Sequence, residues 1–220
     1  MAVAGVFLVG ISNSTFGTLG VVFGHGVGLR VSEVAAMMSL SLLAGSASQI
    51  PVGMLSDRID RRYVLIGLTL VAAMVDIYFL TMRPGSATTI LIATSIFGGA
   101  IYSMYPVIIA HASDHAAPDS FLKISGGLLL VFGVGAIVGP LVGGAAMTFG
   151  PAGMFAVTLG AHLSLAVYGA WRISRREAVA EGDKGAFVAQ QVGRLATPES
   201  ATLDPRAEAA EAEALSGDPE

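Results

Sequence analysis

Long apolar stretches alternate with short polar connectors along most of this chain. Six stretches are each long enough, at roughly 20 mostly apolar residues, to cross the hydrocarbon core of a bilayer as a helix. They cover residues 2–23, 34–55, 63–82, 88–110, 121–149 and 153–171. Because a bilayer offers no water to backbone polar groups, unbroken apolar runs of this length indicate helices. The pattern therefore predicts an all-α, polytopic membrane protein with six transmembrane helices.

The polar residues are gathered mainly at the C-terminal end. Residues 1–172 form the predicted six-span domain, whereas residues 173–220 are rich in Ala and Glu and poor in large apolar side chains. A segment of that composition cannot bury enough apolar surface to fold into a core. We expect residues 173–220 to be a polar, disordered cytoplasmic tail.

Composition agrees with a lipid environment and excludes several kinds of site. Hydrophobic residues make up 54% of the chain, charged residues 13%, and the mean hydropathy is +0.72, unlike an ordinary soluble domain. With 0 Cys, the chain has no disulfide and no zinc–thiolate site. It lacks the Gly-Lys-Ser/Thr motif that cradles phosphates. We expect neither enzymatic activity nor a cofactor. We expect the chain to contact a lipid bilayer and not to bind nucleic acid.

The distribution of Lys and Arg predicts the orientation of the spans. Cytoplasmic loops of membrane proteins carry an excess of these residues. Only two lie at one side of the predicted bundle, Arg30 and Arg83. Those at the other side are Arg58, Arg61, Arg62, Lys123, Arg172, Arg175 and Arg176. We therefore predict a multi-pass protein of the cell (inner or plasma) membrane with both termini cytoplasmic.

The connector between the second and third spans carries a motif. Residues 53–62 read Gly-Met-Leu-Ser-Asp-Arg-Ile-Asp-Arg-Arg, which resembles the Major Facilitator Superfamily signature G-x-L-(A/S)-D-R-x-G-R-R in that loop. Asp60 stands where Gly is commonest, which leaves the tight-turn role of that Gly open. The resemblance implies a gating role for Gly53, Asp57, Arg58, Arg61 and Arg62. From the residues alone, the positive-inside rule is the better explanation of the three Arg, and the resemblance is what favours gating.

Glycines recur four residues apart in the fifth span, at Gly135, Gly139 and Gly143. This spacing places them on one face and lets a neighbouring helix approach closely. Pro140 removes one hydrogen bond within the helix. The segment resembles the Gly-Pro-rich fifth helix of a superfamily half and, with residues 105–118, is similar to uncharacterised bacterial transporters of the YcaD type. Ordinary helix packing without any moving role is the alternative.

The resemblance also implies how the six spans are arranged. Each half of such a transporter consists of two inverted triplets of helices, and the middle span of each triplet here carries Pro followed closely by Gly, at Pro51 and Pro140. Because the polar tail follows the sixth span, the chain resembles the C-terminal half. We expect a secondary transporter of a small solute that needs a missing N-terminal half or a second copy. The alternative is a non-transporting fragment that only associates with a partner half.

Polar residues in the first and fourth spans are candidates for solute binding, since these helices line the central cavity in the superfamily. Asn13, Tyr102 and Tyr105 are the residues we select. Their amide and hydroxyl groups can orient a polar solute against an apolar wall. Hydrogen bonds between helices are the alternative role.

Two ionisable residues lie within apolar spans, Asp76 in the third and His162 in the sixth. Charges at this depth are costly and often functional, so both are candidates for proton coupling, with a structural role as the alternative. His111, Asp114 and His115 have a spacing compatible with a helical metal site. We expect them to form hydrogen bonds within their loop and predict no metal.

Overall fold

A computed structural model describes residues 2–114 and 121–175, and these residues form six α-helices. The helices are α1 (Ala2–Gly26), α2 (Val31–Arg58), α3 (Arg61–Met82), α4 (Ala87–Ser113), α5 (Phe121–Met147) and α6 (Gly153–Ile173). Each contains a stretch long and apolar enough to cross a membrane, so the six predicted spans are confirmed. Several helices extend past the predicted bounds, whereas α5 ends at Met147, two residues before the predicted end.

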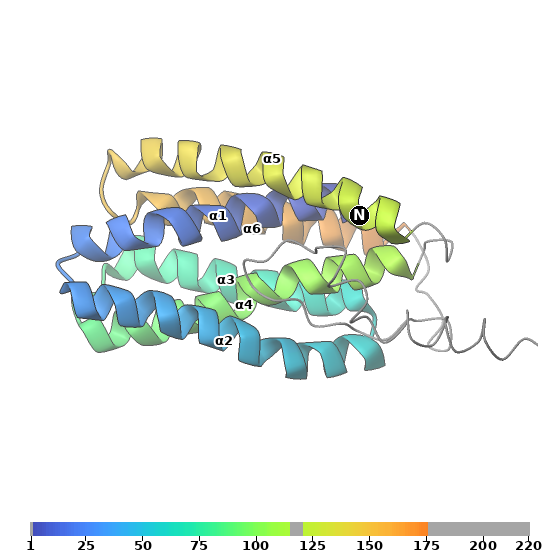
Figure 1. The fold of residues 1–220 in the computed structure, drawn as a ribbon, viewed down its shortest axis with the longest axis horizontal. Coiled ribbons are helices and arrows are strands. Elements are labelled where there is room, and N and C mark those ends of the chain that lie inside the picture. Colours follow the sequence, from blue (N-terminus) through green and yellow to red (C-terminus); the bar gives the residue numbers. More distant parts are fainter. Residues whose placement is uncertain (1, 115–120, 176–220) are drawn as a thin grey trace, which may run out of the picture.

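The helices run along one long axis and form a bundle (Figure 1). In this view α2 and α5 lie at opposite edges, α1 and α4 lie between them, and the fainter α3 and α6 lie behind. The main contacts join α1 with α5, α2 with α4, and α3 with α6. Exchanging the first three helices for the last three reproduces these contacts, as an inverted repeat requires.

Glycines allow α1 and α5 to approach very closely. A methyl group built at Gly135 would overlap the carbonyl oxygen of Phe7, and one at Gly139 would overlap that of Ile11. Gly10 faces the carbonyl of Phe132 in the same way from α1. Small residues at a helix interface permit this backbone contact in lipid. The predicted glycine face of the fifth span therefore lies against α1.

The pair formed by α2 and α4 uses both glycine and hydroxyl groups. A methyl group at Gly98 would overlap the backbone of Ser41. The Ser48 hydroxyl lies 2.8 Å from the carbonyl oxygen of Gly99 and 2.8 Å from the hydroxyl of Ser103. Such interhelical hydrogen bonds are typically worth about 0.6 kcal/mol within a membrane. They fix the register of α2 against α4.

Aromatic rings fill the region where α1, α3, α4 and α6 meet. Phe79 stacks on Phe155 with ring centroids 4.4 Å apart, and Phe23 contacts both rings edge to face. By contrast, large apolar side chains on the outer face of α5 are exposed, among them Leu130, Ile137 and Leu141. Exposed apolar surface of this kind marks contact with lipid or with another protein.

The N-terminus of α2 is held by local contacts. The backbone N–H of Arg30 donates to the Glu33 carboxylate at 2.8 Å, and the Arg30 guanidinium donates to it at 2.7 Å. The structure begins the helix at Val31, three residues before the predicted start of the second span at residue 34. Residues 115–120 and 176–220, which include His115 and most of the predicted tail, lie outside the described residues.

Candidate functional site

The connector between α2 and α3 contains only Ile59 and Asp60. The Asp60 carboxylate accepts the backbone N–H of Arg62 at 3.0 Å and so caps the N-terminus of α3. Its second oxygen lies 2.6 Å from the Arg62 guanidinium. Asp60 has φ −61°, an ordinary backbone conformation that does not call for Gly. The carboxylate thus replaces a tight-turn glycine with a helix cap.

The environment of Asp60 sets its charge state. Burial acts to raise the pKa of the Asp60 carboxyl, but the hydrogen bonds and charge of Arg62 outweigh it and leave the pKa below its ordinary value. Asp60 therefore remains ionised at neutral pH and paired with Arg62. This local pair shapes the turn and leaves Arg61 to reach other helices.

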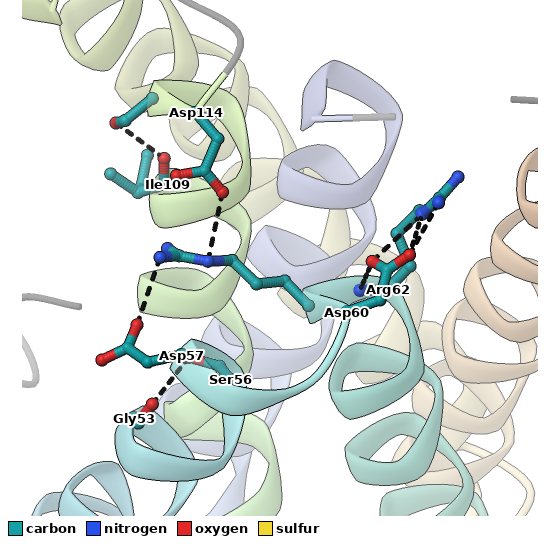
Figure 2. Close-up of polar contacts among 9 residues, drawn as sticks. Gly53, Ser56, Asp57, Asp60, Arg62, Ile109 and Asp114 are labelled. Atoms are coloured by element: carbon teal, nitrogen blue, oxygen red, sulfur yellow. Dashed lines mark hydrogen bonds and ion pairs between the residues drawn. The ribbon is translucent and has the colours of Figure 1, made fainter. Parts of the chain in front are cut away.

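Arg61, the first residue of α3, is the centre of a network that joins three helices. Its Nη2 lies 3.2 Å from Asp57 Oδ1 on α2, and its Nε lies 3.2 Å from Asp114 Oδ2 directly after α4. Figure 2 shows the carboxylates of Asp57 and Asp114, each joined by a dashed line to its ion-pair partner. The side chains of Arg61 and Asp114 are 1% and 2% exposed, whereas Asp57 is 41% exposed.

The pairing of Arg61 with Asp114 is a buried one. Removing a single partner of such a pair leaves an unpaired charge away from water, which costs about 3–5 kcal/mol. The contact therefore binds the end of α4 to the start of α3 as long as water is excluded. Opening this end of the bundle would hydrate both ions, and the pair would lose most of its strength.

Comparison with known proteins identifies the family. The Major Facilitator Superfamily matches residues 2–212 of the chain. The chain belongs to this superfamily. An uncharacterised superfamily-type transporter named YcaD from Escherichia fergusonii is 28% identical over 141 residues, which cover 64% of this chain and 35% of that protein. A YcaD protein from Salmonella arizonae is 29% identical over 113 residues, covering 51% of this chain and 28% of the relative.

A solved structure shares the fold of this superfamily chain. The crystal structure of an auto-inhibited peptide transporter of the POT family superposes with a TM-score of 0.62 at 12% identity. The match covers 81% of this chain and 38% of the peptide transporter. The chain thus spans about a third of the length of the curated relatives it matches, and it represents part of a superfamily domain.

The residues that carry the superfamily signature differ in their burial and in their contacts. Gly53 is buried, and its carbonyl accepts the Ser56 hydroxyl at 2.9 Å. Arg58 is exposed, and among the described residues the structure shows no ion pair for it. Asp57 and Arg61 of the predicted gating set join Asp114 in the network across helices. The five predicted gating residues therefore differ in burial and in the contacts they make.

Asp114 is the member of this network that sequence reasoning placed elsewhere. We expected it to form hydrogen bonds within its loop, most of which lies outside the described residues, and the structure pairs it with Arg61. The signal available in the sequence is an acidic residue at the end of an apolar span on the side rich in Arg. Among residues 2–114 and 121–175, no group of His, Cys, Asp and Glu is arranged to hold a metal ion.

The predicted solute-binding residues lie on the two central helices but make separate contacts. Asn13 on α1 is half-buried, and its Oδ1 has no hydrogen-bond partner within the described part of the chain. The Tyr102 ring covers Gly45 of α2. The Tyr105 ring packs edge to face on Phe132 of α5, with centroids 5.1 Å apart. Among the described residues, the structure shows no hydrogen bond between Asn13 and either Tyr.

Asp76 and His162, selected separately in the sequence, are in direct contact. His162 Nδ1 lies 2.6 Å from Asp76 Oδ2. The other ring nitrogen of His162 lies 2.8 Å from the hydroxyl of Ser12 on α1. Sequence reasoning did not predict this contact because a helical residue's rotational position relative to a distant helix depends on packing. These contacts of Asp76, His162 and Ser12 lie apart from the Arg61 network.

Proposed function

We propose that the chain forms one wall of a secondary transporter that moves a small solute across the cell membrane by alternating access. The observation that carries this proposal is the buried Arg61 guanidinium between Asp57 on α2 and Asp114 after α4. Membership of the Major Facilitator Superfamily and the fold shared with a peptide transporter support it.

The network has the properties required of a latch at one mouth of the bundle. Its ion pairs connect the ends of α2, α3 and α4 (Figure 2). With water excluded they hold these ends together, and with water admitted they weaken. On this proposal the mouth alternates between two arrangements, one dry and paired and one wet and open. The positive-inside rule supports placing this mouth at the cytoplasmic face.

Solute contact is assigned to the central helices α1 and α4. The Asn13 Oδ1 atom is buried without a hydrogen-bond partner in the described chain, and a buried polar atom in this state is costly unless a ligand or water satisfies it. Tyr102 and Tyr105 present hydroxyl groups from α4. Together they suit a small polar solute bound partly by apolar contact.

A cysteine-labelling experiment tests the latch. The chain contains 0 Cys, so Asn13→Cys gives one reactive thiol on α1. In inside-out and right-side-out vesicles, a membrane-impermeant maleimide reports which side reaches this thiol. We expect Asp114→Asn to increase labelling from the cytoplasmic side several-fold, because Arg61 loses its buried partner.

Arg58→Ala is the matched control for this experiment. It removes an exposed positive charge from the same connector, and we expect labelling of Asn13→Cys to stay unchanged. Equal labelling in the Asp114→Asn and Arg58→Ala backgrounds would overturn the latch, because the ion pair would then have no influence on access to α1.

A second candidate function follows from the length of the match. The chain spans about a third of its curated relatives, so it also suits a non-transporting component that associates with a partner half. Reconstitution separates the two roles. A transporting assembly takes up solute from a screened panel when the chain is reconstituted as a dimer or with a second half. A component that binds a partner half and yields no uptake supports the alternative.

A further inference from the structure

Four polar side chains from three helices form one hydrogen-bonded row inside the bundle. Ser12 Oγ on α1 lies 2.8 Å from His162 Nε2 on α6, and His162 Nδ1 lies 2.6 Å from Asp76 Oδ2 on α3. The Thr158 hydroxyl on α6 donates to Asp76 Oδ1 at 2.6 Å. All four residues are at most 1% exposed.

The surroundings of this row are apolar. The Phe97 ring of α4 meets the His162 ring edge to face, with centroids 5.8 Å apart. Within the described residues, only His162 and Thr158 act on the Asp76 carboxylate. The charged groups of the packed helices lie at helix ends, as Arg61 on α3 and Arg172 on α6 do. The row must therefore balance its own charge.

The order Ser, His, Asp resembles the row that activates a nucleophile in hydrolases. A nucleophile must reach its substrate, and Ser12 has 0% of its surface exposed. An acyl substrate could not approach this hydroxyl without separating α1 from α6. Binding and release of a proton therefore explains the row better than nucleophilic catalysis does.

Charge balance determines how many protons the row holds. An ionised Asp76 beside a neutral His162 would leave one net negative charge in an apolar interior, at a cost of several kcal/mol. One additional proton removes the net charge. It gives either an imidazolium paired with a carboxylate or a neutral imidazole paired with a carboxylic acid. Both arrangements contain the same number of protons.

The hydrogen-bond inventory links this proton to Ser12. In both neutral arrangements His162 Nε2 carries hydrogen and donates to Ser12 Oγ, because Nδ1 is engaged with Asp76. Without the additional proton, Nε2 has a lone pair and accepts the Ser12 hydroxyl. Loss of the proton thus reverses the hydrogen bond between α6 and α1.

We infer that Asp76 and His162 form a proton-binding site, loaded with one proton in this structure, whose occupancy is conveyed to α1 through Ser12. On release the Nε2–H bond breaks, and the proton passes to a water molecule that enters beside Ser12. The imidazole keeps its Nδ1 hydrogen toward the Asp76 carboxylate. Ser12 adjoins Asn13, so the site lies next to the proposed solute wall. Its coupling to solute rests on the proposed transport function, whereas its proton occupancy does not.

Nitrogen NMR tests the occupancy directly. The chain, labelled with ¹⁵N-histidine, is placed in phosphatidylcholine nanodiscs, and its 4 His are observed between about pH 6 and pH 8. His162→Gln identifies the signals of His162 by their loss. We expect Nε2 of His162 to be protonated at neutral pH. An Nε2 without hydrogen would overturn the inference, because the row would then be a fixed anion.

Two variants extend the test beyond the native chain. Asp76→Asn removes the negative charge, so we expect the row to lose its additional proton and His162 to become a neutral imidazole. Thr158→Val is the matched control, because it removes one hydrogen bond to Asp76 and preserves both ionisable groups. We expect Nε2 to stay protonated in that variant. A protonated imidazolium in Asp76→Asn would contradict the inference, and if this variant does not fold, the native measurement alone decides.

The nanodisc measurement needs neither solute nor a partner half. An unprotonated Nε2 would therefore remove the proton site and leave the Arg61 latch untouched. Conversely, unchanged labelling of Asn13→Cys in the Asp114→Asn background would remove the latch and leave the proton site standing. The failure of one proposal is thus distinguishable from the failure of the other.

Discussion

Arg61 Nε lies 3.2 Å from Asp114 Oδ2, and the two side chains are 1% and 2% exposed. This contact predicts a large loss of stability when one ion is removed alone. We expect Arg61→Ala to lower the free energy of unfolding by about 3–5 kcal/mol, since the buried Asp114 carboxylate loses its ion pair with Arg61. Unfolding in mixed micelles by increasing SDS measures the change.

The control for this prediction is Arg58→Ala, an exposed residue of the same connector. Its expected effect is within about 0.5 kcal/mol, as for most surface substitutions. A double variant, Arg61→Met with Asp114→Leu, removes both ions and should recover much of the lost stability. Equal destabilisation by Arg61→Ala and Arg58→Ala would mean that the buried pair contributes nothing to folding.

The sequence was sufficient to predict the fold, because each span can be recognised from its own composition. It also located the charged connector at residues 53–62 through the spacing of Gly53, Asp57 and the Arg residues. It did not predict that Arg61 would form an ion pair with Asp114, which lies some fifty positions away in the chain. That contact depends on how α3 and α4 are rotated against each other, which local composition does not encode.

Asp60 predicts a dependence of stability on pH. The pKa of its carboxyl is lowered in the folded chain, because Arg62 outweighs the opposing effect of burial. A lowered folded-state pKa adds stability above the unfolded pKa of about 3.9, and this stability is lost as the pH falls through the folded value. We expect Asp60→Asn to be less stable than the native chain at pH 7, with the difference shrinking below about pH 4.

Unfolding midpoints of both chains at neutral and acidic pH measure this dependence. Asp60→Gly, which restores the residue commonest in the family signature, is a useful companion variant. It should destabilise by a few tenths of a kcal/mol through the cap and further through loss of the Arg62 pair. A gain of stability in Asp60→Gly would show that the turn does require glycine, contrary to the φ of −61°.

Gly135 and Gly133 provide a matched pair on α5. A methyl group at Gly135 would overlap the carbonyl oxygen of Phe7, whereas nothing lies within 4 Å of one at Gly133. We expect Gly135→Ala to destabilise the bundle by about 1–3 kcal/mol through overpacking. Gly133→Ala should be neutral or slightly stabilising, because Ala is a better helix former. Equal unfolding midpoints for the two variants would contradict the close approach of α1 and α5.

Ser48 and Ser103 predict an efficient cross-link between α2 and α4. Their hydroxyl oxygens lie 2.8 Å apart, so cysteines at these positions should form a disulfide on mild oxidation. The chain has 0 Cys of its own, which removes any background reaction. Ser46 is exposed on α2, and the pair Ser46→Cys with Ser103→Cys should remain reduced. A mobility shift on non-reducing gels distinguishes the two pairs.

The buried polar residues show a second feature that the sequence predicts only in part. Asp76 and His162 stand out in the sequence because ionisable residues are rare in apolar spans. Their contact, and the addition of Ser12 and Thr158 to it, arise from three helices meeting at one depth. Ser and Thr are ordinary residues in membrane helices, so nothing in the sequence distinguishes these two from their neighbours.

The close pairing of α1 with α5 has a consequence for how the protein is made. Individual helices enter the bilayer in order and then associate, yet the glycine contacts of α1 belong to α5, which emerges four spans later. The pair α2 and α4 is complete as soon as α4 is inserted. A chain arrested after α4 therefore displays the Gly10 surface of its first helix to lipid. Until α5 is inserted, the glycine surface of α1 lacks its packing partner and is accessible to the quality-control proteins of the membrane.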